Sequence, residues 1–143
     1  MFALLKARIE DQVPVLAGRV EGAADLAELT RKGAWPQASP AAHLVPLGLQ
    51  GRGAYSATGA FTQILREMVS VVLTLRTYDR AAGDDLPELH ELIQAVLQAV
   101  AGWGPDESVG VFELARGSLI HNRDGRLVYQ LDFAIDDQLR ILA

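Results

Sequence analysis

The sequence predicts an α+β domain over residues 1–143, in which a long amphipathic helix covers one face of a mainly antiparallel sheet of about four strands. Three observations predict this class. Strand-type alternation runs through residues 66–78, helical periodicity runs through residues 86–100, and an Asp-Gly turn joins two strand-like segments near the C-terminus. Short helices near the N-terminus complete the predicted architecture.

The central strand is predicted in residues 66–78, REMVSVVLTLRTY. Apolar side chains occupy every second position from Val69 to Leu75, a period typical of a strand with one buried face. We expect the helix at 86–100 to cover this face, with Val71 and Ile93 in the core. The opposite face is only semi-polar and suits a drier contact, such as a neighbouring subunit. The residues predicted for that contact are Met68, Ser70 and Val72.

The N-terminal third of the chain predicts two short helices and one strand. Apolar residues four apart indicate a helix over 2–13 that Pro14 ends, and an extended connection follows over 14–20. A second helix is expected over 23–32, ended by Gly33. Residues 42–49 are apolar enough for a strand, and Pro46 within them favours an edge position or a bulge.

Residues 50–62, QGRGAYSATGAFT, predict a mobile loop, because three glycines and small polar residues show no sustained period. Within this segment Arg52 and Tyr55 are residue types favoured at protein interfaces, as are Arg123 and Arg126 at the predicted hairpin tip. The alternative is that all four are ordinary solvated loop residues. Both interpretations stay open at this point.

The C-terminal half predicts a helix followed by a hairpin. Leucine, isoleucine and valine recur at helical spacing over 86–100, and Pro87 suits the first turn. Strands are expected over 109–120 and 126–136, joined by a turn at Asp124 and Gly125. A two-residue turn would set Ile120 opposite Tyr129, whereas a three-residue turn would shift every pair, so the register stays open.

Composition excludes several classes of function. The net charge is −5 and the arginines are scattered, which argues against a nucleic-acid-binding surface. Without cysteine there are no disulfides and no thiolate metal sites. Neither a secretory signal pattern nor an apolar run of about 18 residues is found, so we expect no membrane contact and synthesis in a cytoplasm.

No motif predicts catalysis. The three histidines, His43, His90 and His121, lie on separate predicted elements without metal-ligand spacing. Paired acids occur only at element ends, where capping and solvated turns commonly use them. The Gly51-Arg52-Gly53 stretch lacks both the third glycine and the following helix of a dinucleotide-binding loop. We therefore expect no enzyme activity, no metal and no cofactor.

Four stretches together resemble the tail terminator proteins of long-tailed bacteriophages and of related prophages or gene transfer agents. They are VPVLAGRVEGAADLAEL, SPAAHLVPLG, REMVSVVLTLRTYD and LHELIQAVLQAVAGWGPDES, in this order and spacing. The resemblance rests on diffuse pattern and covers most of the chain. It includes the helix leading to Pro14, the strand from Pro40 to Gly48, and the long helix closing on Gly102-Trp103.

The resemblance implies a structural virion protein at the tail end or neck, made in the cytoplasm of the bacterial host. Such proteins form a homohexameric ring on the tail tube, stop its polymerisation and contact the head-tail connector or neck proteins, while DNA passes through the ring without specific binding. The family has no catalytic residues to carry over. The second face of the central strand and the 42–49 strand would then serve ring contacts, and the loop around Arg52 and Tyr55 would meet tube or neck.

Two other readings of the sequence compete with this one. Another neck or tail-completion protein of the same particle would share the size, the assembly and the lack of chemistry. A small ligand-binding or enzymatic α+β domain would need a polar pocket with convergent acid, base or nucleophile groups.

Overall fold

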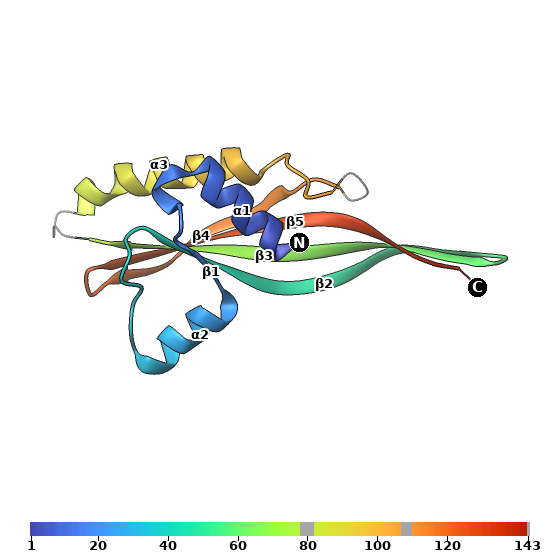
Figure 1. The fold of residues 1–143 in the computed structure, drawn as a ribbon, viewed down its shortest axis with the longest axis horizontal. Coiled ribbons are helices and arrows are strands. Elements are labelled where there is room, and N and C mark those ends of the chain that lie inside the picture. Colours follow the sequence, from blue (N-terminus) through green and yellow to red (C-terminus); the bar gives the residue numbers. More distant parts are fainter. Residues whose placement is uncertain (78–81, 107–109, 143) are drawn as a thin grey trace.

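The computed structural model describes residues 1–77, 82–106 and 110–142, with the backbone alone for 82–86. The chain forms three α-helices, one 3₁₀ turn and five strands within these ranges (Figure 1). Their order is α1 (Phe2–Gln12), η1 (Pro14–Leu16), β1 (Val20–Gly22), α2 (Ala23–Lys32), β2 (Ala41–Ala57), β3 (Ala60–Arg76), α3 (Ala82–Val100), β4 (Glu113–Arg123) and β5 (Arg126–Leu142).

The five strands form one mixed sheet in the order β1-β2-β3-β5-β4, so the prediction of about four mainly antiparallel strands is wrong. The additional strand, β1, is parallel to β2 and pairs Val20 with Ala42 and Gly22 with Leu44. The prediction treated this segment as an extended connection because three residues are too few to show alternation. The same pairing removes the start of β2 from the predicted edge position.

Helices cover both faces of the sheet, which also differs from the predicted arrangement. Helices α1 and α3 lie on one face, and α2 lies on the other (Figure 1). Both α1 and α2 have the bounds expected from the sequence to within a residue, while α3 begins at Ala82, earlier than predicted. Pro87 lies inside α3, within its first two turns.

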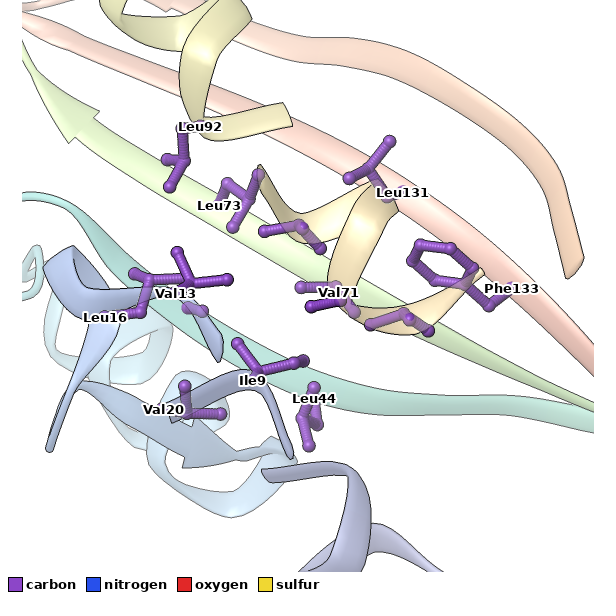
Figure 2. Close-up of a cluster of buried hydrophobic side chains, with 14 of the residues drawn as sticks. Ile9, Val13, Leu16, Val20, Leu44, Val71, Leu73, Leu92, Leu131 and Phe133 are labelled. Atoms are coloured by element: carbon purple, nitrogen blue, oxygen red, sulfur yellow. The ribbon is translucent and has the colours of Figure 1, made fainter. Parts of the chain in front are cut away.

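The hydrophobic core lies between β3 and the helices α1 and α3, as the alternation of the central strand predicted. Val69, Val71 and Leu73 are fully buried on β3, and they pack in one cluster with Leu92 and Val96 of α3. Val71, Leu73 and Leu92 of this cluster are labelled in Figure 2. Ile93, the predicted core partner on α3, is only partly buried beside this cluster. The helix therefore turns its Leu89, Leu92, Val96 and Val100 side toward the sheet.

The C-terminal hairpin has the two-residue turn at Asp124 and Gly125, both with positive φ angles of 57° and 71°. These angles fit a type I′ turn, for which Asp-Gly is a favoured sequence. Bulges at Ala115 and Ile120 then shift the register, so Leu119 lies opposite Tyr129 and Arg116 opposite Asp132. The first predicted residue of this strand, Val109, lies outside the described residues.

The segment 50–62 is not a loop, contrary to the prediction. It forms the end of β2, a tight turn at Thr58 and Gly59, and the start of β3, with Ala57 paired to Ala60. Strand β5 continues to Leu142, beyond its predicted end, and pairs with β3 as far as Ala60. The glycines hid the strand period in the sequence, and pairing with β3 supplies the backbone hydrogen bonds that order the segment.

Candidate assembly surfaces

The ends of β2, β3 and β5 project beyond the helices as a three-stranded arm, made of residues 47–65 and 138–142 (Figure 1). Several large apolar side chains of the arm are exposed. Tyr55 is 70% exposed, Leu142 68% and Leu49 65%, with Leu47, Ile64 and Ile141 also exposed. Single exposed apolar residues are ordinary, but several on one projection are typical of a contact surface.

The two faces of the arm differ in their side chains. One face, called here the Tyr55 face, places Tyr55, Thr62 and Arg140 side by side on the three strands. Ile64 and Leu142 lie on the same face, two residues along their strands. The other face pairs Phe61 with Ile141 and carries Leu49, Leu65 and Leu139.

Charge separates the arm from the rest of the chain. The arm contains two arginines, Arg52 and Arg140, and no aspartate or glutamate. The remaining residues of the arm are apolar or neutral. The rest of the chain carries the other eleven cationic residues and all eighteen acidic ones. No ion pair of Arg52 or Arg140 occurs within the described residues. The arm is therefore a cationic projection from an acidic body.

The second face of the sheet is covered in part by α2, which leaves an apolar cavity of about 440 Å³ between helix and sheet. Leu26 and Leu29 of α2 line one side, and Val72, Thr74 and Ile120 line the other. Of the residues predicted for a subunit contact, Ser70 is 1% exposed and Met68 and Val72 are half-buried. Their roles stay predictions.

The end of the sheet opposite the arm holds the other predicted contact residues. Arg123 and Arg126 lie opposite each other where β4 turns into β5. The Arg126 guanidinium lies 5.8 Å from the centre of the Trp35 ring, and that ring lies 5.1 Å from the His121 ring. The structure thus places the predicted contact residues in three separate regions: the arm, the sheet face beneath α2, and the hairpin end.

The described residues contain no cluster of three or more His, Asp or Glu side chains that could hold a metal ion. Asp136 accepts a hydrogen bond from Arg66 at 3.1 Å, and Arg66 also contacts Glu113, so this acid is engaged in an ion-pair network. Asp84, Asp85 and Glu107, from the other paired acids, lie outside the described side chains.

His43 is the one histidine of the described chain that is buried, at 2% exposure, and its Nδ1 has no hydrogen-bond partner among the described residues. Burial lowers its pKa below 6.5, while the carboxylates of Asp25 and Glu21 act in the opposite direction. The unfolded chain therefore binds a proton near pH 6.5, whereas the folded chain binds it only at lower pH. Stability contributed by neutral His43 is complete above pH 6.5 and declines as the pH falls through the lower folded pKa.

We therefore expect the urea concentration at the midpoint of unfolding to decrease when the pH is lowered from 7.5 to about 5.5, since protonation in this range favours the unfolded chain. The variant His43→Gln should lose most of this pH dependence, because it cannot titrate. His90→Gln, at an exposed position of α3, is the matched control and should keep the wild-type dependence. An equal slope in wild type and His43→Gln would contradict the assignment.

An exposed arm with large apolar side chains and a second sheet face that is only partly covered are typical of a protein that makes contacts with other proteins. No helix among the described residues is long and apolar enough to cross a membrane. A comparison with family models matches residues 2–142 to the family described as phage tail terminator protein. The chain belongs to this family, and is accordingly a structural phage tail protein and a component of the virion. A search of curated proteins found no match.

Sequence reasoning named Arg52 and Tyr55 as contact candidates, a role that stays a prediction, but it placed them in a loop and missed the arm that carries them. One signal was present in the sequence. Leu139 and Ile141 lie on the apolar face of the last strand beyond its predicted end, and Phe61 and Leu65 lie at odd-numbered positions of the central strand upstream of residue 66. Two strands that both run past the core point to a sheet that continues beyond the helices.

Proposed function

We propose that this chain caps the tail tube as a homohexameric ring, ends tube polymerisation and forms the joint to the head-tail connector or neck proteins. Membership of the phage tail terminator family supports this role. The observation that carries it is the arm: Tyr55, Leu49 and Leu142 are 65–70% exposed, and no other described part of the chain covers them. Burying such side chains stabilises a complex by about 1.5–3 kcal/mol each, which only a partner can supply.

The acidic body suits a ring around DNA. With eighteen acidic residues and a net charge of −5, the chain repels the phosphate backbone, so DNA can pass through the ring without specific binding. The proposed location is the tail end or neck of the virion, after synthesis in the cytoplasm of a bacterial host. The proposed role is the same whether the particle belongs to a phage, a prophage or a gene transfer agent.

Light scattering tests the ring. We expect the purified protein, whose chain mass is 15.4 kDa, to show six times this mass, either at once or as the concentration rises. The physical reason is that association removes the exposed apolar surface of the arm and of the partly covered sheet face from water, which is favourable. A strict monomer at every concentration would contradict assembly in the absence of a tail tube.

Tube length tests termination itself. Purified protein added to growing tail tubes should stop elongation at sub-stoichiometric amounts relative to the tube protein, with length measured by electron microscopy. Binding along the sides of the tube, or tubes of unchanged length, would favour another neck or tail-completion role.

A ligand-binding domain is the second candidate, and the cavity beneath α2 is the observation that favours it. Its volume of about 440 Å³ lies within the range of small-molecule pockets, about 300–1,000 Å³. Its lining is mostly apolar, with Thr30, Thr74, His121 and Gln130 as polar residues. A monomer that is stabilised against heat by an apolar small molecule would support this candidate.

A further inference from the structure

A second hollow lies between η1 and the N-terminal half of α3, and we call it the helix groove. Its volume of about 240 Å³ falls below the range of small-molecule pockets, about 300–1,000 Å³. Its lining is apolar, with Val13, Pro14, Val15 and Pro40 on one side and Leu92 and Ala95 on α3. Val15 is 54% exposed, so the groove has an apolar floor open to solvent. A hollow of this size fits an inserted side chain.

Two glutamates of α3, Glu88 and Glu91, line the same groove. Both are exposed, and neither forms an ion pair within the described residues. The groove therefore combines an apolar floor with two exposed carboxylates that have no ion-pair partner in the described part of the chain. A partner that fits both features has exposed apolar side chains next to unpaired cations.

The Tyr55 face of the arm has this composition. Exposed Tyr55, Ile64 and Leu142 surround Arg140 on adjacent strands, and Arg52 lies in the bulge three residues before Tyr55. The arm contains no acid that would repel Glu88 or Glu91. DNA would match the arginines alone, because phosphates do not cover exposed apolar side chains. The combination favours a protein surface with acidic and apolar groups together.

The arm and the helix groove lie toward opposite ends of the long axis of the molecule. The arm projects past the helices at one end, whereas η1 and the start of α3 lie toward the other end (Figure 1). A contact between them cannot be made within one chain. Between copies it joins two different surfaces, and such a head-to-tail contact produces a closed ring when the rotation between subunits allows it.

We propose that the Tyr55 face of the arm of one copy docks into the helix groove of the next copy, with Tyr55 against the apolar floor and Arg52 and Arg140 beside Glu88 and Glu91. This contact depends on the proposed ring function, and it would be the interface between neighbouring subunits of the ring. Tyr55 would lose its large exposed area. The two arginines and the two glutamates, which form no ion pairs among the described residues, would pair with each other.

Charge exchange tests the contact. R52E/R140E alone and E88R/E91R alone should each weaken self-association at least about tenfold, because two attractive pairs become repulsive. Combining all four changes restores opposite charges across the contact and leaves the net charge at −5, so association should recover. The control K6E/K32E changes net charge as R52E/R140E does, at exposed sites outside the arm and the groove, and should leave association intact. Sedimentation velocity gives the association constants, and circular dichroism checks folding.

Photo-crosslinking locates the contact independently of its strength. Because the chain has no cysteine, Tyr55→Cys accepts one benzophenone maleimide at a single place. In a mixture of isotope-labelled and unlabelled protein, we expect mixed crosslinks from residue 55 to residues 13–15 or 88–95 of the other copy. Crosslinks from residue 55 to any other region of the second copy would overturn the proposal.

The outcomes separate this contact from the ring itself. Two results would overturn the arm contact and leave the ring proposal intact. One is a hexamer that persists in both charge-reversed variants, and the other is a variant with all four substitutions whose self-association does not recover. A wild type that is monomeric at every concentration, without mixed crosslinks, would contradict ring and contact together. Loss of association in each pair of changes, with recovery in the combined variant, supports both.

Discussion

Replacement of Val71 by Asp is expected to leave the domain unfolded at 25 °C. Val71 is fully buried on the central strand, and it packs in the cluster formed by β3, α1 and α3 (Figure 2). No cationic side chain is part of that cluster. The variant must therefore bury a carboxylate without a partner, or lose the packing of two helices on the sheet. Either route costs about 4 kcal/mol or more, a large part of the stability of a domain of this size.

Circular dichroism and a thermal scan measure this effect. The matched control is Ile64→Asp, which places the same side chain on the same strand at a position 45% exposed. We expect the control to fold with a melting temperature within a few degrees of wild type, because a carboxylate there stays in water. A folded Val71→Asp protein with an unchanged melting temperature would contradict the assigned core.

Removal of the arm is expected to abolish assembly and leave the body folded. In this variant an Asn-Gly turn replaces residues 51–65, and the chain ends at Asp137. Gln50 and Arg66 are paired in the sheet, so a two-residue turn can join them. The core cluster contains no arm residue, so its packing is retained. The exposed Tyr55, Ile64, Ile141 and Leu142 are lost with these residues, whereas Leu47 and Leu49 at the base of the arm are kept.

The expected result is a monomer at concentrations where the wild type is a hexamer, with a cooperative thermal transition. Light scattering measures the mass, and added tail tubes should no longer stop growing. As a control, Asn-Gly in place of Thr58 and Gly59 changes the turn and keeps both faces of the arm. A truncated protein that still forms hexamers would place the ring contacts elsewhere, for example on Met68 and Val72 of the second sheet face.

The sequence by itself determined the elements whose patterns are long or chemically distinctive. Alternation located the central strand and its buried odd-numbered face, because the odd-numbered residues from Val69 to Leu75 are all apolar and only that face can enter the core. Helical spacing located α3, and the Asp-Gly pair located the type I′ turn. The quoted stretches also indicated the family, which the comparison with family models confirms over residues 2–142.

Only the tertiary structure decided the features that depend on a neighbour. Strand β1 has three residues and exists because β2 supplies its hydrogen-bond partners. The bulges at Ala115 and Ile120 shift the register of β4 against β5, and the type of turn does not predict them. The glycine-rich end of β2 is a strand because β3 pairs with it along its length, and β5 supports β3 from the other side. Patterns within a segment are local, whereas these contacts join residues far apart in the chain.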